Sequence, residues 1–508
     1  MASLRRRITS IGLALALLFS LSLATPIGAQ GHGGGGGGGG GGGVIDPPPG
    51  AAFRDPVAMT NASTIPGIFE GYLEAKIAPV NVNGTVANLY TYNGLYPGPI
   101  IKVKRGDMLK LHFTNSLPAT TAKNILGFEK NHTNLHTHGL HVSPEEPADA
   151  AHLDIAPGQT YNYEYDLSLQ PGGCLNFLHG HVHGLTAEQY WGGMLATILV
   201  ADETPVLQGY ETHVMVLKDI TLNGNVPQPY TMTSDYMQGK EGNIVMVNGQ
   251  VNPVLSILPG QIQRWQILNG SNARFYNLSL QGHEFYLVGT DGGLLDKPYR
   301  ISSLLLSPGE RADLLVKASA TKGNYKLLSL PYSRRGNMAS PQITLLTLSV
   351  KSGQPSSAVV PASIDPAATR LSEDPMYPKK TLVLSMGQGR GYINGQDFDV
   401  DPYTIMSDVG TYEVWEILNQ SGMDHPFHQH VNAAQVLSVT GGDPGYASLY
   451  TSIPAWKDVV IVPKWGSVRI LVPVMDYTGM TMFHCHILEH EDIGMMGMWH
   501  IMGMGEGM

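Results

Sequence analysis

Short runs of β-branched and apolar residues alternate with Gly, Pro, Asn and Asp along the chain from about residue 65 onward. Runs of this length, separated by turn-forming residues, predict many short β-strands rather than long helices. Strands in this number and spacing are typical of β-sandwiches or barrels. The clearest of these runs are 100–113, 160–167, 195–200, 257–268, 304–316, 344–350, 412–418 and 468–473.

One pattern of strand, Gly turn and second strand occurs three times along the chain. The second strand of each copy ends in an asparagine, at Asn115, Asn269 and Asn419. Copies spaced by about 155 residues indicate related domains rather than a single fold of this length. The repeat therefore predicts an all-β protein built of three consecutive sandwich domains.

The ends of the chain and the joints between domains have a different composition. Arg5, Arg6 and Arg7 precede an apolar stretch and then small residues, as in a secretory signal peptide. A membrane anchor is the alternative, but the apolar stretch is shorter than the about 20 residues that a span needs. The expected parts are a signal peptide (1–29), a Gly/Pro-rich flexible tether (30–64), a first domain (65–204), a second (205–353), a Pro/Ser/Ala-rich linker (354–380) and a third domain (381–508).

Composition and charge exclude several classes of protein. Charged residues make up 14% of the 508 residues, and 61 Gly with 34 Pro suit a turn-rich β protein better than a helical bundle. The formal net charge of −10 argues against a nucleic acid as partner. Two cysteines exclude a disulfide framework. We expect a secreted or periplasmic protein with no stable membrane span.

Ten of the 19 histidines fall into four short clusters. Residues two apart on a strand point to the same face, so each His-X-His pair presents two imidazoles together. Imidazole and thiolate are ligands for copper, zinc and iron. The clusters are His136-Thr-His138, His179-Gly-His181, His425-Pro-Phe-His428-Gln-His430, and His484-Cys485-His486 followed by His490 and Met495.

The fourth cluster favours copper over zinc. It provides Cys485, a histidine five residues later and a methionine ten residues later, and His425 supplies a second imidazole. Two His, one Cys and a weak axial Met form the electron-transfer copper site, whereas structural zinc takes four strong ligands. The other eight histidines suffice for three more metals. The sequence therefore predicts one mononuclear copper and one trinuclear cluster, with four copper ions per chain.

Together the four motifs resemble those of the multicopper oxidases, the family that contains laccases, bilirubin oxidases and cuprous oxidases. The resemblance extends over nearly the whole chain after residue 65 and includes the segments 248–250, 291–293 and 307–313. It implies three consecutive cupredoxin-like Greek-key domains. The trinuclear cluster then lies between the first and third domains, and the second domain is a spacer.

The resemblance also implies a role for each ligand. It assigns the type 1 copper to His425, Cys485, His490 and axial Met495, the type 2 copper to His136 and His428, and the type 3 pair to His138, His179, His181, His430, His484 and His486. A donor then gives up single electrons at the type 1 copper. Cys485 passes them through its two histidine neighbours, and dioxygen is reduced to two waters.

Four further residues have expected roles around these ligands. Glu489 matches a family position that resembles a proton donor, and Asp149 is a second candidate. Asp424 is expected to hydrogen-bond a ligand imidazole, because ligating histidines usually have such a partner. Cys174 is expected to be a small buried thiol, with an extra ligand as the alternative.

The expected activity is laccase-like, with dioxygen as acceptor and phenols, aromatic amines or similar small molecules as donors. The alternative within the class is a metallo-oxidase for Cu(I), Fe(II) or Mn(II). A copper nitrite reductase would lack the paired His-X-His sets, and a non-catalytic copper carrier has no use for eight extra histidines. The C-terminal 14 residues hold six methionines, which predict either cuprous-ion capture or strand core.

Overall fold

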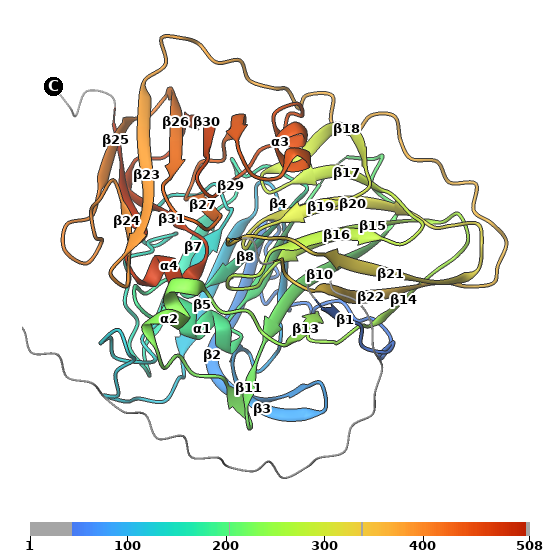
Figure 1. The fold of residues 1–508 in the computed structure, drawn as a ribbon, viewed down its shortest axis with the longest axis horizontal. Coiled ribbons are helices and arrows are strands. Elements are labelled where there is room, and N and C mark those ends of the chain that lie inside the picture. The colour runs from blue at the N-terminus through green and yellow to red at the C-terminus, as the bar shows by residue number, and fades with distance from the viewer. Residues whose placement is uncertain (1–42, 203, 337–338, 504–508) are drawn as a thin grey trace, which may run out of the picture. The chain divides into compact units, whose positions relative to one another are not determined.

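The computed structural model describes residues 43–202, 204–336 and 339–503. Within these residues the sheets pair into three β-sandwiches that follow one another along the chain (Figure 1), so the all-β prediction is confirmed. The expected signal peptide (1–29) and residues 30–42 of the expected tether lie outside the described residues. No helix in the described part of the chain is long and apolar enough to cross a bilayer.

The first sandwich pairs the sheet β3-β2-β5-β7 with the sheet β4-β9-β8-β6. Alternate residues of β5 are buried, as expected for a strand with one face on the core. The elements are β2 (Ile68–Val82), β3 (Thr85–Tyr92), β4 (Ile100–Lys104), β5 (Met108–Asn115), β6 (His136–His138), β7 (Thr160–Asp166), β8 (Cys174–His179), α1 (Thr186–Gly192) and β9 (Ala196–Ala201).

The second sandwich pairs the sheet β13-β10-β15-β20-β17-β18 with the sheet β1-β22-β21-β16-β19, to which β14 adds beside β22. The ribbon β11 (Leu222–Asn223) and β12 (Val226–Pro227) and the helix α2 (Thr233–Gln238) project from it. The remaining strands are β1 (Val44–Ile45), β10 (Glu211–Ile220), β13 (Ile244–Val247), β14 (Val254–Ile257), β15 (Ile262–Asn269), β16 (Tyr276–Leu280), β17 (Phe285–Thr290), β18 (Gly293–Ile301), β19 (Leu304–Leu306), β20 (Arg311–Lys317), β21 (Gly323–Leu330) and β22 (Gln342–Val350).

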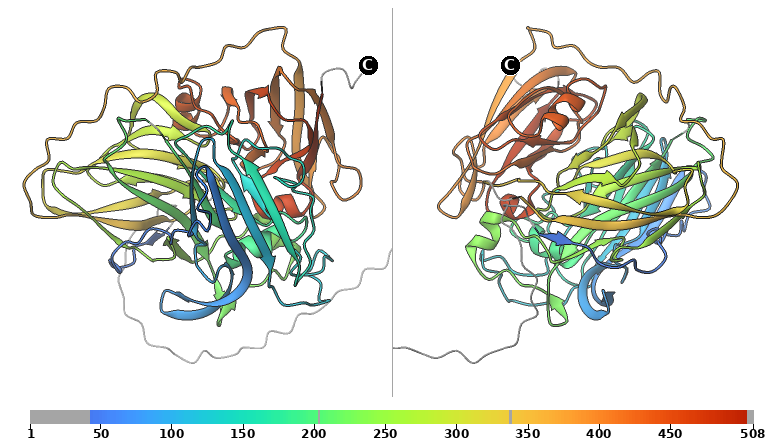
Figure 2. Two further views of the ribbon diagram at one scale, coloured as in Figure 1. Left: turned by 180° about the vertical axis from the view of Figure 1, so that it is seen from behind. Right: turned by 45° about the vertical axis from the view of Figure 1, so that its right-hand side comes forward.

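The third sandwich pairs the sheet β24-β23-β26-β30-β28 with the sheet β25-β32-β31-β27-β29. Figure 2 shows its strands, in orange and red, close to the blue and teal strands of the first sandwich. The elements are β23 (Lys379–Gly387), β24 (Arg390–Ile393), β25 (Thr404–Asp408), β26 (Thr411–Asn419), β27 (His425–Gln429), β28 (Gln435–Thr440), α3 (Pro444–Tyr450), β29 (Val459–Val462), β30 (Ser467–Val474), β31 (Gly479–Cys485), α4 (Leu488–Asp492) and β32 (Met496–Met502).

The predicted repeat occupies the same place in all three sandwiches. Asn115, Asn269 and Asn419 end β5, β15 and β26, each of which has one parallel and one antiparallel neighbour. Each asparagine accepts a hydrogen bond from the main-chain N–H two residues on and donates to two main-chain carbonyls further along the chain. A short amide can close such a local turn, which explains the recurrence of Asn at this position.

The described part of the expected tether, 43–64, is not a free segment. β1 adds in parallel to β22, the main-chain N–H of Gly50 donates to the Asn252 carbonyl at 2.8 Å, and that of Met59 donates to the Ile100 carbonyl at 2.8 Å. These bonds attach the segment to both the first and the second sandwich. Composition predicted flexibility because few side chains here are apolar, but main-chain pairing at a sheet edge does not depend on side chains.

Residues 351–378, which include most of the expected linker, contain no helix or strand. The segment crosses the surface from the second sandwich to the third (Figure 1). Ser356 donates its main-chain N–H to the Pro259 carbonyl at 2.7 Å, and Leu371 donates to Gln435 Oε1 at 2.8 Å. The linker is therefore fixed to the domains it joins at several points.

Candidate metal centres

Four histidine-bearing strands bring eight imidazoles together where the first sandwich meets the third. β6 and β8 pair so that His136 lies opposite His179, and β27 and β31 pair so that His428 lies opposite His484. The other members of this eight-histidine group lie on these strands or one or two residues beyond them, and all are buried. The group consists of His136, His138, His179, His181, His428, His430, His484 and His486.

The ring nitrogens of the eight-histidine group converge from both sandwiches. His428 Nε2 lies 3.4 Å from His136 Nε2. His181 Nε2 and His430 Nε2 each lie 3.2 Å from His484 Nε2. Residues separated by about 290 to 300 positions in the chain thus approach to the distance at which one metal ion can bind several ligands.

The chemical state of these imidazoles fits metal binding. Several buried ring nitrogens have no hydrogen-bond partner among the described residues, including His179 Nε2 and both nitrogens of His486. A buried polar atom without a partner is costly unless a metal satisfies it. Burial, followed by repulsion from neighbouring imidazoles or the Arg311 guanidinium, lowers the pKa of His138, His179, His181, His428, His430 and His486 well below the usual value. Neutral imidazole is the form that ligates metals.

A second site lies within the third sandwich. His425 Nδ1 and His490 Nδ1 lie 3.4 and 3.5 Å from Cys485 Sγ and 3.2 Å from each other. β27 supplies the first imidazole, β31 the thiol, and the short helix α4 the second imidazole. Met495 is fully buried and its carbonyl accepts a hydrogen bond from the Cys485 N–H at 3.1 Å. One thiol and two imidazoles in this arrangement match an electron-transfer copper site.

The hydrogen-bond partner of His425 differs from the prediction. Ser421 Oγ lies 2.7 Å from His425 Nε2 and directs the other ring nitrogen toward the cysteine. Asp424, which was expected to have this role, instead accepts from the Tyr332 hydroxyl at 2.7 Å and from the Lys464 N–H at 2.7 Å. The side chain next to a strand residue points to the opposite face, so the neighbour of a ligand cannot reach its ring.

The two predicted proton-transfer carboxylates have different surroundings. Asp149 Oδ2 lies 2.8 Å from His136 Nδ1, and its other oxygen accepts from the Thr137 N–H at 2.7 Å. Burial alone would raise the pKa of Asp149, but attraction and hydrogen bonds to His136 and Thr137 lower it below its usual value. Asp149 therefore orients His136, as carboxylates commonly do for ligating histidines.

Glu489 does not lie among the cluster histidines. Its carboxylate accepts from the Tyr230 hydroxyl at 2.6 Å and from the Lys240 N–H at 3.0 Å, both in the second sandwich. The carboxylate beside the histidines is that of Glu491, whose oxygens lie 3.1 Å from His484 Nδ1 and 3.7 Å from His181 Nε2. The structure therefore places Glu491 beside the cluster imidazoles, where Glu489 was expected, and sequence reasoning missed Glu491.

Cys174 is a buried thiol outside both metal centres. Its Sγ donates to the Pro171 carbonyl at 3.2 Å and accepts from Asn176 Nδ2 at 3.2 Å and Gln170 Nε2 at 3.4 Å. Burial raises the pKa of the Cys174 thiol. These contacts agree with the expected structural role and leave no place for Cys174 as a ligand.

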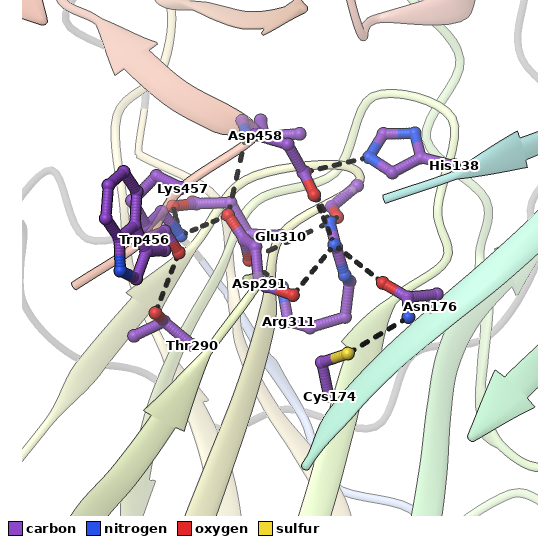
Figure 3. A network of polar contacts seen from close by, with 12 residues as sticks. His138, Cys174, Asn176, Thr290, Asp291, Glu310, Arg311, Trp456, Lys457 and Asp458 are labelled. Carbon is purple, nitrogen blue, oxygen red and sulfur yellow. Dashed lines mark hydrogen bonds and ion pairs between the residues drawn. The ribbon is translucent and has the colours of Figure 1, made fainter. Parts of the chain in front are cut away.

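A buried ion pair connects the second sandwich to the eight-histidine group (Figure 3). Both terminal nitrogens of Arg311 bind the Asp458 carboxylate, with Nη1 at 2.6 Å from Oδ1. Asp458 Oδ1 also lies 3.1 Å from His138 Nε2, and the Asp458 carbonyl lies 2.8 Å from His428 Nδ1. Because Arg311 Nε donates to the Leu175 carbonyl at 2.9 Å, one guanidinium contacts all three sandwiches.

A second buried charge stands next to this ion pair. The Lys457 ammonium lies 2.8 Å from Asp291 Oδ2 and 2.7 Å from Glu310 Oε1 (Figure 3). Burial alone would lower the pKa of Lys457, but the two carboxylates raise it above its ordinary value. The second domain thus provides charges that hold the segment before β29 against the histidines, and it is more than the spacer predicted from its lack of copper motifs.

Comparison with known proteins agrees with this site. Three family models, each described as multicopper oxidase, match residues 74–205, 199–356 and 373–502. A Staphylococcus aureus protein named multicopper oxidase mco is 30% identical over 82% of this chain and 84% of its own length. A Bacillus subtilis laccase is 27% identical over 80% of this chain and 89% of its own length.

A solved structure of a multicopper oxidase from Campylobacter jejuni, described as a metallo-oxidase, is 28% identical. It superimposes with a TM-score of 0.78 over 90% of this chain and 97% of its own. The three sandwiches, the cysteine–histidine site and the eight-histidine group define a copper-dependent oxidoreductase. The chain belongs to the multicopper oxidase family.

Proposed function

We propose that this protein couples four one-electron oxidations of a phenolic or aromatic donor to the reduction of dioxygen to two waters. The position of Cys485 carries the proposal: its thiol lies in the cysteine–histidine site, and its chain neighbours His484 and His486 lie in the eight-histidine group. A continuous bonded path therefore joins the two centres. When bound, copper supplies single-electron transfer at the first centre and dioxygen reduction at the second.

We assign four copper ions to these residues. The type 1 site takes His425, Cys485, His490 and Met495, the type 2 site takes His136 and His428, and the type 3 pair takes His138, His179, His181, His430, His484 and His486. The 3.4 Å separation of the His136 and His428 nitrogens supports the type 2 assignment. The mutual approach of His181, His430 and His484 supports one half of the type 3 pair.

The donor must deliver electrons through a protein cover, because His425 and His490 are both fully buried. α2 packs against α4, which carries His490, and Arg334 donates to the Gln238 carbonyl at 2.8 Å at the end of α2. A phenol docked on this cover needs no direct contact with a ligand. Oxidation of Cu(I), Fe(II) or Mn(II) is the second candidate, supported by the description of the Campylobacter jejuni structure as a metallo-oxidase.

One purified sample tests the proposed function. We expect about four coppers per chain, an intense blue band, and one dioxygen consumed for every four electrons taken from a phenol. Parallel assays with a phenol and with Cu(I) rank the two donor classes. One copper with blue colour and no oxygen uptake would instead indicate a copper carrier. The N-terminal sequence supports export, so the copper should be measured on protein recovered from the cell exterior or periplasm.

Two matched variants test which carboxylate delivers protons to the dioxygen site. Glu491→Gln removes the carboxylate beside His484 and His181 and should lower the rate of dioxygen turnover about 10–100-fold. Glu489→Gln changes the same atoms two residues away, where they contact Tyr230 instead, and should have a much smaller effect. Stopped-flow reoxidation of fully reduced, copper-loaded protein measures this step directly. Equal losses in both variants would contradict the assignment of Glu491.

A further inference from the structure

Methionine and histidine side chains gather on one face of three neighbouring strands, β31, β32 and β25. β31 and β32 pair with Met482 opposite Met498 and Met480 opposite His500, and directly opposed residues lie on the same face of a sheet. β25 adds Met406 beside His500 in the same row. The opposite face of β32 carries Trp499 and Ile501 into the hydrophobic core. The thioethers are therefore gathered on the face that is not used for the core of the third sandwich.

A cavity of about 220 Å³ lies at this face. Its walls include Met480, Met482, Met498 and His152, and it reaches Asp149. Met480 is 39% exposed, Met498 is half-buried, and His152 is exposed. The His152 ring has no hydrogen-bond partner among the described residues. Three thioethers and one free imidazole thus line a single hollow that opens to solvent.

Packing alone does not require sulfur at these positions. Leucine fills the volume of methionine with little loss of stability, and a partly exposed position needs no apolar filler. Thioethers are soft ligands that favour Cu(I) over harder cations, and imidazole also binds copper. The donor set therefore matches a cuprous ion better than zinc, calcium or an organic ligand.

The cavity is also close to the eight-histidine group. Met482 lies two residues before His484 on β31, which is about 7 Å along a strand. The Met482 carbonyl accepts from the His430 N–H at 3.1 Å, and Asp149 contacts His136. We propose that this cavity binds one cuprous ion through Met480, Met482, Met498 and His152, in addition to the resident copper. This proposal does not depend on which donor the oxidase uses.

Competition for Cu(I) tests the site without relying on activity. Copper-loaded protein is fully reduced under nitrogen, so that no further electrons can be accepted, and is titrated with Cu(I) against the chromophoric chelator bicinchoninate. Wild type should retain one extra Cu(I). In Met480→Leu/Met498→Leu the affinity for that ion should fall more than about 100-fold, because two ligands are lost where an outer-shell partner alone is worth about 10–100-fold.

The control variant is Met232→Leu/Met376→Leu, which removes two thioethers that are 60% and 86% exposed elsewhere on the chain. It should bind the extra Cu(I) as wild type does. Resident copper content and the blue band show that each variant is folded. No extra Cu(I) in wild type, or equal affinity in all three proteins, overturns the site. Unchanged affinity in His152→Ala overturns the part assigned to the histidine.

Discussion

Cys485→Ser should remove the blue absorption and reduce oxygen uptake with every donor by more than about 100-fold. The thiol lies between His425 and His490, and a serine hydroxyl is not a substitute for thiolate as a copper ligand. The same sulfur begins the bonded path to His484 and His486. Loss of an outer-shell partner alone costs about 10–100-fold in many metal sites, so loss of this ligand should exceed that range.

Cys174→Ser is the matched control, since it removes the other thiol of the chain by the same change. Cys174 Sγ contacts Pro171, Asn176 and Gln170, which a hydroxyl can also hydrogen-bond. This variant should keep its blue band and its oxygen uptake. Visible spectra, copper content and an oxygen electrode measure both variants. Oxygen uptake that persists in Cys485→Ser would show that electrons reach the histidines by another path.

Arg311→Leu should destabilise the folded protein by about 3–5 kcal/mol, because it leaves the buried Asp458 carboxylate without its cation. The loss should extend to the metal centre, because Asp458 also contacts His138 and His428. We expect a lower midpoint of thermal unfolding together with incomplete copper loading. Arg311→Lys should lose less stability and less copper than Arg311→Leu but should not reach wild type, since an ammonium cannot bind the carboxylate through two nitrogens.

Arg300→Leu is the control for loss of an arginine from the same domain. Arg300 pairs with Glu284 on the surface and is 67% exposed, so its removal should change little. Differential scanning calorimetry and copper analysis on the same preparations separate stability from loading. A normal copper content in Arg311→Leu, with only the unfolding midpoint lowered, would mean that the ion pair holds the domains together without positioning the ligands.

The sequence by itself determined the fold class and which histidines are grouped, because both depend on local order along the chain. Alternation of apolar and polar residues predicts strands at short range. The two-residue period of a strand places both members of a His-X-His pair on one face, whatever the rest of the fold does. In the same way, the local spacing of Cys485, His490 and Met495 favours copper over other metals at this site.

Only the tertiary structure decided which residues support these ligands. Glu489 and Glu491 flank His490 on α4, and two residues in a helix are separated by about 200° of rotation, so they face opposite sides. The packing of α4 places Glu491, and not Glu489, beside the cluster histidines. Arg311 and Asp458 are 147 positions apart, and nothing in the local sequence pairs them. Contacts between domains depend on how the sandwiches dock, and that arrangement has no short-range signal in the chain.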